Sequence, residues 1–286
     1  MNVYFAVVEI FVYLMFILLV ALQFKKPKKY RKTHILFAGL AFGLILEIFN
    51  IMIWHTYSYG NVFLIYIHGI PLGIGAAWAV ILHIAMTVSN RIGKAHQIPE
   101  FVLPFVDALM VMSFDIVLDV LAVRYGGWNW LIPSSVEWFG VPYENFAGWI
   151  FVALAFSIIV RFSSIIEKVV LLRKKPKIII RLTRLLIPVT SYMLLLLIFI
   201  PCTILINTIY LIKNYNVSGL TTLSIKKFLA HDPTIVYDVW ISQIKEIMFI
   251  LLLVAMLVVV LYYFVKRGVL SAENLKIEKK YQNFKK

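Results

Sequence analysis

The sequence has 286 residues, of which 62% are hydrophobic and 15% are charged, and it carries a net charge of +14. Soluble domains have about half apolar and a quarter charged residues, so this composition excludes an ordinary soluble protein and indicates an integral membrane protein. The single cysteine, Cys202, also excludes an intrachain disulfide and a multi-cysteine metal site.

Seven apolar stretches, each long enough to cross a bilayer, predict an all-α protein with seven transmembrane helices in one domain over residues 1–286. No basic residue precedes the first stretch and Lys25 follows it, which is typical of an anchor rather than a cleaved signal. In chain order the predicted spans are about Val3–Phe24, Ile35–Trp54, Pro71–Val88, Pro99–Val123, Phe146–Ile166, Leu185–Ile212 and Ile244–Val265.

The basic residues predict the orientation of these spans. With Met1 outside, the inner segments hold 22 of the 28 Lys and Arg residues and the outer segments hold five. This asymmetry is what the positive-inside rule requires of a multi-pass protein of the cell membrane with its N-terminus outside and its C-terminus, the basic tail 266–286, in the cytoplasm. The charge is therefore expected to serve orientation and attraction to anionic membrane lipids, not nucleic-acid binding.

The second and fourth spans begin two similar units, at about 40–90 and 112–162. In both units the second aromatic residue stands ten residues before a Gly-x-Pro word, and a Trp stands seven residues after its Pro. Both run the same way through the membrane, so they predict a parallel internal repeat of helix pairs 2–3 and 4–5. The matching residues are Glu47, Tyr57, Tyr59, Gly69, Pro71 and Trp78 in the first unit and Asp119, Trp128, Trp130, Gly140, Pro142 and Trp149 in the second.

Carboxyl groups inside the spans are the candidates for catalysis. A carboxylate is costly in lipid, so such a residue is expected to face the protein interior and to serve a function. Asp115 and Asp119 stand four residues apart and therefore share a helix face. If the two units face each other, Glu47 joins them near the outer leaflet, under the aromatic loops. Asp107 lies deeper, and Glu9 is a structural partner or a further contributor.

The stretch "FGVPYENFAGW" is unusually polar for a segment beside an apolar span. Gly140 and Pro142 predict a turn there, since Pro disfavours helix before it and Gly permits a tight approach. Asn145 is then expected to cap the fifth span, and the aromatic residues of both units are expected to contact a substrate. Gly69 and Pro71 predict the same turn in the first unit.

Two other classes of membrane protein, retinal pigments and membrane prenyltransferases, need residues that can be looked for in the sequence. A retinal pigment needs a Lys in its last span, and residues 248–265 contain none. A membrane prenyltransferase would bind a diphosphate through magnesium on two Asp-rich motifs. Asp115 and Asp119 have the spacing of one such motif, but the first unit has Gly43 and Glu47 there and no second cluster follows. The sequence therefore predicts no metal and no cofactor.

The words "FDIVLD", "GGWNW" and "FGVPYENFAGW" resemble the motif region of the carotenoid biosynthesis membrane proteins, which include carotenoid hydratases. The resemblance extends over about Leu44 to Ile159. It implies a cofactor-free enzyme that hydrates the terminal double bond of a long acyclic carotenoid or other isoprenoid lipid, giving a tertiary alcohol. The residues carried over from the family are Asp115, Asp119, Trp128, Trp130, Gly140, Pro142, Asn145, Gly148 and Trp149.

That chemistry needs a neutral acid in a dry pocket, a second carboxylate to orient water, and aromatic faces beside the cation. Asp119 is the expected proton donor, because its counterpart Glu47 is also an acid, and Asp115 is the expected modulator or water-orienting base. Two alternatives remain open from the sequence. One is a non-enzymatic lipid binder or transporter, and the other is a different isoprenoid-modifying enzyme, such as a cyclase or prenyltransferase.

Overall fold

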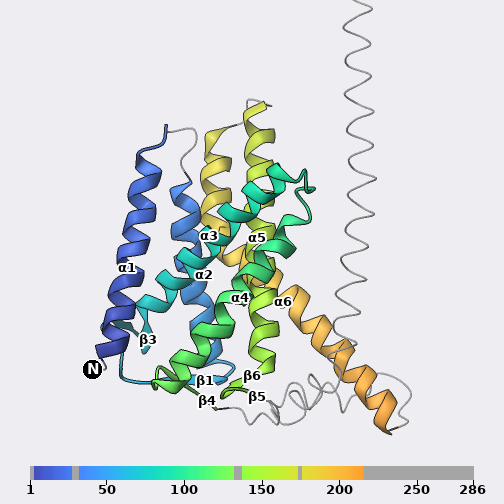
Figure 1. The fold of residues 1–286 in the computed structure, drawn as a ribbon. Coiled ribbons are helices and arrows are strands. Elements are labelled where there is room, and N and C mark those ends of the chain that lie inside the picture. The colour runs from blue at the N-terminus through green and yellow to red at the C-terminus, as the bar shows by residue number, and fades with distance from the viewer. Residues whose placement is uncertain (1–2, 28–31, 132–136, 173–175, 216–286) are drawn as a thin grey trace, which may run out of the picture.

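The computed structural model describes residues 3–27, 32–131, 137–172 and 176–215, which form six α-helices and three small sheets (Figure 1). The helices are α1 (Val3–Phe24), α2 (Thr33–Met52), α3 (Leu72–Ala95), α4 (Leu103–Arg124), α5 (Tyr143–Leu172) and α6 (Lys177–Tyr215). The strands are β1 (Tyr57–Tyr59), β2 (Tyr66–Ile67), β3 (Ile70–Pro71), β4 (Trp128–Trp130), β5 (Glu137–Trp138) and β6 (Val141–Pro142).

Each of the first six predicted spans coincides with one helix of the structure. Five of these helices, all except α4, are long and apolar enough to cross a membrane. The helix α4 carries Asp107, Asp115 and Asp119, all buried, and packs between α3 and α5. The predicted seventh span, Ile244–Val265, lies outside the described residues, as do the tail and most of the outer loop before that span.

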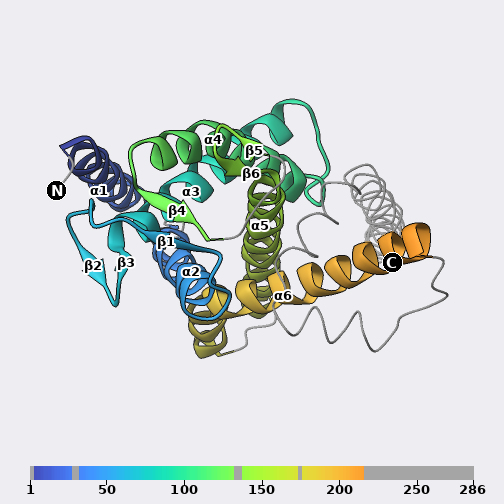
Figure 2. The same cartoon turned by 90° about the horizontal axis from the view of Figure 1, so that it is seen from below.

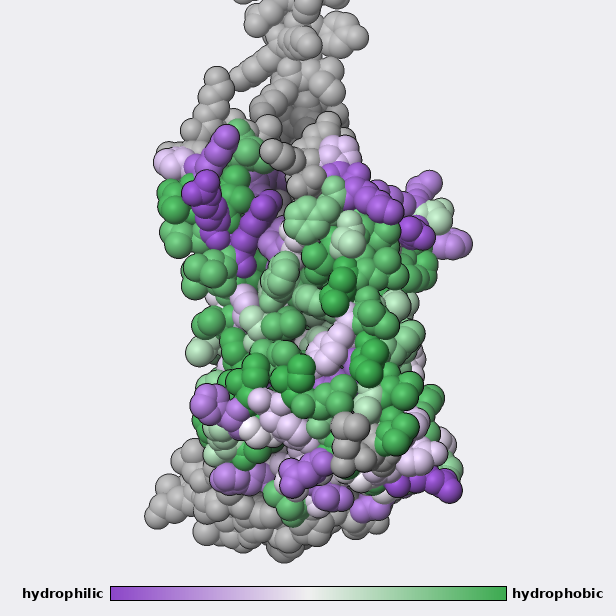
Figure 3. Space-filling model, turned by 90° about the vertical axis from the view of Figure 1, so that its left-hand side faces the viewer, coloured by the Kyte–Doolittle hydropathy of each residue, from purple (hydrophilic) through white to green (hydrophobic). Residues whose placement is uncertain are grey.

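The face of the molecule in Figure 3 is mainly hydrophobic in its middle part, with polar residues gathered toward both ends. Long apolar side chains on α1, α4 and α6 are exposed, among them Leu14, Val117 and Leu197, which are 59%, 58% and 72% exposed. An apolar belt of this kind is the surface that a membrane protein presents to lipid tails. The chain is therefore a membrane protein in the part that the structure describes.

The three sheets gather at one end of the bundle, here called the hairpin end (Figures 1 and 2). The strands β2 and β3 form one tight hairpin before α3, and β5 and β6 form another before α5. The strand β1, which follows α2, pairs with β4, which follows α4, in antiparallel register. This pairing joins the two predicted units at the hairpin end of the bundle.

The opposite end of the helices, here called the basic end, carries lysines at the turn from α1 to α2 and at the ends of α3 and α5, including Lys26, Lys32, Lys94 and Lys168. Between the two ends, α2 and α5 meet in the core, where the rings of Phe42 and Phe156 stack with centroids 5.2 Å apart. This contact holds α2, which carries Glu47, against α5, which carries Asn145.

Candidate functional site

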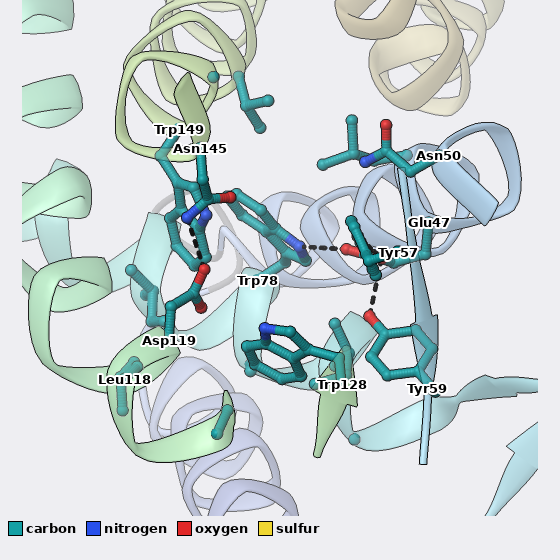
Figure 4. Close-up of a pocket in the computed structure, with 18 of the residues that line it drawn as sticks. Glu47, Asn50, Tyr57, Tyr59, Trp78, Leu118, Asp119, Trp128, Asn145 and Trp149 are labelled. Carbon is teal, nitrogen blue, oxygen red and sulfur yellow. Dashed lines mark hydrogen bonds between the residues drawn. The ribbon is translucent and has the colours of Figure 1, made fainter. Parts of the chain in front are cut away.

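A cavity of about 910 Å³ lies inside the bundle beneath the paired strands β1 and β4. All six helices contribute to its wall, and most lining side chains are aliphatic or aromatic. Ligand sites typically have this size and this mainly apolar character, with a few polar groups that fix the orientation of the ligand. Figure 4 shows that these polar groups come from two places on opposite sides of the cavity.

The first polar group is Glu47 of α2, whose side chain is 3% exposed. The hydroxyl groups of Tyr57 and Tyr59 both donate to its Oε2, the latter at 2.7 Å, and the indole Nε1 of Trp78 donates to Oε1 at 3.1 Å. Burial, and then the charge of Glu47, raise the pKa of Tyr57 and of Tyr59 well above the ordinary value. Both hydroxyls therefore keep their protons and remain donors, and three donors stabilise the ionised form of a carboxyl group.

The second polar group is a pair of aspartates on one face of α4. The amide nitrogen of Asn145 donates to Oδ2 of Asp115 at 2.9 Å and to Oδ2 of Asp119 at 2.6 Å. Asp119 lines the cavity, whereas Asp115 is fully buried one helical turn behind it and is not part of the wall. Among the described residues, the Oδ1 atom of Asp115 has no hydrogen-bond partner. Two carboxyl groups held this close favour a state in which they share a proton.

Aromatic rings line the cavity at the end next to β1 and β4 and at its centre. The β1–β4 register places Tyr57 opposite Trp130 and Tyr59 opposite Trp128, with ring centroids 5.1 Å and 6.0 Å apart. At the centre, the rings of Trp78 and Trp149 stack with centroids 4.2 Å apart. The negative faces of such rings attract a cation, and their bulk displaces water.

The two predicted turns are tight hairpins that lead into helices. Gly69 and Gly140 have φ of 81° and 86°, a region that favours glycine, and the residues before them, His68 and Phe139, have φ of 49° and 50°. Pro71 and Pro142 end the hairpins, directly before α3 and α5 begin. Of the four turn residues predicted from sequence, Pro142 alone lines the cavity.

One expectation about Asn145 needs correction. It was expected to cap the fifth span, but α5 begins at Tyr143, so Asn145 lies inside the first helical turn. Its amide group donates to the two aspartates of α4 instead. The hairpin brings α5 to α4 at this turn, so the amide group of Asn145 supplies a donor to two buried carboxyl groups.

Most of the predicted site residues lie together on the cavity wall. They are Glu47, Tyr57, Tyr59, Trp78, Asp119, Trp128, Trp130, Asn145, Gly148 and Trp149. Asn50 of α2 and Tyr192 of α6, which were not predicted from the sequence, also line the cavity. Asn50 lies three residues after Glu47 on the same face of α2, whereas Tyr192 reaches the site through the packing of α6 against α2.

Glu9 also lines the cavity, although it lies on α1, outside both units. Its Oε2 accepts the backbone N–H of Leu64 at 2.6 Å, its Oε1 accepts the hydroxyl of Tyr13, and its stem packs against Gly73, where a Cβ would lie 2.6 Å from Cγ of Glu9. Glu9 therefore holds α1 against the loop between β1 and β2 and against the start of α3.

Asp107 belongs to a separate polar cluster nearer the basic end. Its Oδ2 lies 2.7 Å from the guanidinium of Arg161, and the hydroxyl groups of Ser89 and Ser157 donate to the same carboxylate. Arg161 also donates to Asn90 at 2.8 Å. This cluster joins α3, α4 and α5 and does not reach the cavity. In the described part of the chain, no three His, Cys, Asp or Glu side chains are grouped as metal ligands.

The comparison with known protein families gives one finding. A family model described as "Carotenoid biosynthesis protein" matches residues 2–213, which covers all six helices up to the last turn of α6. No curated protein and no solved structure matches the chain.

Proposed function

The chain belongs to the carotenoid biosynthesis protein family, and from this premise we propose that it hydrates the terminal double bond of a long acyclic carotenoid or related isoprenoid. The product is a tertiary alcohol. The observation that carries the proposal is an apolar cavity with the buried carboxyl groups of Glu47 and Asp119 on its wall, the second of which is bridged by the amide of Asn145 to Asp115 behind it. An alkene has no polar group that an enzyme can hydrogen-bond. A catalyst for its hydration therefore needs a strong proton donor in a dry site lined by aromatic rings.

In this proposal the Asp115–Asp119 pair supplies the proton. Asp119 lies on the wall of the cavity and donates its proton to the less substituted carbon of the double bond, leaving a tertiary cation on the other carbon. Asp115, behind it, shares this proton before the transfer and accepts a hydrogen bond from the same amide group of Asn145. General acid catalysis by a positioned side chain typically contributes about 10²–10⁴-fold in rate.

Glu47 and the aromatic rings then stabilise the cation. Glu47 accepts hydrogen bonds from three donors, which would stabilise its ionised form, and it lies across the cavity from Asp119 (Figure 4). The faces of Trp128 and Trp149 provide further cation–π stabilisation. Water adds to the cation, and the proton that the water loses returns to the aspartate pair. The two carboxyl groups thus end the cycle in their starting state, and the net reaction is alkene plus water to alcohol.

We also infer that α2–α3 and α4–α5 are two copies of one unit. The residue numbers of matching positions differ by 71 (57 and 128, 59 and 130, 69 and 140, 78 and 149). Both copies have the same hairpin with the same positive φ angles, which supports this inference. The proposal places the hairpin end outside, the basic end in the cytoplasm and the chain in the cell membrane, because lysines gather at the basic end.

The test is expression of the chain in a host that makes acyclic carotenoids, in growth medium enriched in heavy-oxygen water. Hydration predicts a pigment heavier by one water that carries the oxygen label, and no such product with Asp119→Asn. A matched control is Glu100→Gln, at the exposed turn between α3 and α4. An unlabelled, unchanged pigment profile in several hosts would favour the non-enzymatic lipid binder. A cyclised product without added water would favour a cyclase.

A further inference from the structure

The cavity wall includes apolar side chains of α1, α3 and α4 as well as of α6. We call the part of the cavity lined by α1, α3 and α4 the α1–α4 channel. The side chains that define it are Phe11, Val12, Met15, Ile84, Phe114 and Leu118.

Three side chains on the wall of the α1–α4 channel, Phe11, Phe114 and Leu118, are 61%, 40% and 40% exposed. On α6, the wall residues Tyr192 and Leu195 are 3% and 6% exposed, and Leu196, Phe199 and Ile200 are half-buried. The channel is therefore the more exposed side of the cavity. Lipid tails surround this belt of the molecule, so an apolar chain can pass from the bilayer into the channel without crossing water.

The channel exists because α1 is held at its two ends and is loosely packed between them. Near the hairpin end, Tyr4 stacks on Tyr125 at the end of α4 with centroids 4.2 Å apart, and Glu9 binds the backbone of Leu64. Near the basic end, Gln23 is buried and lies 3.3 Å from His83 of α3. No residue of α1 between Glu9 and Gln23 is buried.

We propose that the α1–α4 channel binds the long hydrocarbon chain of the substrate, with the reacting end at Asp119 and the far end in the membrane. This inference rests on the proposed function, since it assumes an isoprenoid ligand. Leu118 on the channel wall and Asp119 both line the same cavity, so the channel is continuous with the space beside the carboxyl group that reacts (Figure 4). Because the channel is open at its far end, the site recognises one end group of the substrate and does not recognise the rest of its hydrocarbon chain. A substrate with two reactive ends is therefore hydrated at one end per binding event.

The test introduces tryptophan on the channel wall and measures retained polyene. Leu118→Trp on α4 and Val12→Trp on α1 narrow the channel from opposite sides. The matched controls are their neighbours Val117→Trp and Leu14→Trp, at positions 58% and 59% exposed that do not line the cavity. All four variants are purified in detergent from a lycopene-producing host, checked for monodispersity, and assayed for lycopene bound per protein.

We expect the two channel variants to retain at least about tenfold less lycopene than the two controls, the scale that overpacking of a filled site produces. Equal retention in all four variants, or no lycopene retained by the unmodified protein, would overturn the channel. The outcome for hydration is separate. If the channel variants lose lycopene but no hydrated product ever forms, the channel stands and hydration fails. If all four hydrate equally fast, hydration stands and the channel fails.

Discussion

Trp78 of α3 stacks on Trp149 of α5 at a centroid distance of 4.2 Å and an interplanar angle of 28°. The two residues occupy the same position in the two proposed copies. The strands β1 and β4 show the same relationship. Ser58 of β1 pairs with Asn129 of β4, which occupies the same position in the other proposed copy. In a twofold arrangement, equivalent residues meet where the axis passes. Both contacts therefore support two copies that face each other around one axis through the cavity.

The two copies carry different chemistry at equivalent positions. Glu47 of the first copy is held by three donors, whereas Asp119 of the second is paired with Asp115. The position that matches Asp115 is Gly43, where a Cβ would lie 2.7 Å from Cβ of Trp78. The first copy thus has room for the indole that donates to Glu47 and none for a second acid. In the proposed reaction, this asymmetry assigns proton donation to the side of Asp119 and stabilisation of the cation to the side of Glu47.

The first prediction concerns Asp119. Replacing it with Asn removes the acidic proton at the cavity wall while keeping the size of the side chain. We expect hydration to fall by about 10²–10⁴-fold with thermal unfolding in detergent nearly unchanged. Product formation in membranes, measured against the amount of inserted protein, checks this. Full activity of Asp119→Asn would mean that another group protonates the double bond.

The second prediction concerns Asn145, which bridges the aspartates without touching the transferred proton. Asn145→Ala removes one donor from each carboxyl group, so we expect activity to fall by roughly tenfold, the scale of one or two lost hydrogen bonds. The matched control is Ile74→Ala, at the equivalent position of α3, which also lines the cavity. A loss for Ile74→Ala as large as for Asn145→Ala would assign the effect to lost packing, not to the bridge.

The helices and the hairpins were predictable from the sequence because their signals are local. Apolar stretches and Gly-x-Pro words gave the six described helices and the entries into α3 and α5. The partners of the acids were less predictable. The bridge from Asn145 to Asp115 and the contact from Glu9 to Leu64 join residues 30 and 55 positions apart. Such contacts depend on how helices pack, and no periodicity or spacing in one sequence encodes them.

The third prediction concerns metal ions. The proposed reaction uses carboxyl groups as acid and as anion, and Asn145 occupies Oδ2 of both aspartates. We therefore expect hydration in purified membranes to continue at an unchanged rate after treatment with a divalent-metal chelator and washing. A rate that disappears with the chelator and returns with magnesium would instead indicate diphosphate chemistry on Asp115 and Asp119, as in a prenyltransferase.

The fourth prediction concerns orientation. The basic end carries the turn from α1 to α2, and the hairpin end carries the loop from β1 to β2. The positive-inside rule predicts that these two points face opposite sides of the membrane, the basic end being cytoplasmic. Reporter fusions after His34 and after Gly60 measure this directly. A cytoplasmic reporter signal from both fusions would contradict the proposed topology.

The fifth prediction concerns the ion pair of Asp107 and Arg161, whose side chains are 1% and 17% exposed. Removal of one partner leaves the other charge buried without compensation, so we expect Arg161→Gln to lower the free energy of unfolding by about 3–5 kcal/mol. The double variant Asp107→Asn with Arg161→Gln should recover much of this loss, because no charge is then left unpaired.

The matched control for that cycle is the pair of Arg184 and Glu167, in which the arginine side chain is 39% exposed. Water and salt screen an ion pair of this kind, so Arg184→Gln should cost no more than about 1 kcal/mol. Thermal unfolding of the unmodified protein and of the three variants in detergent measures these changes. The cluster of Asp107 lies apart from the cavity, so the double variant should also keep most of its hydration activity. A folded double variant without activity would mean that Asp107 serves the reaction as well as the packing of α3, α4 and α5.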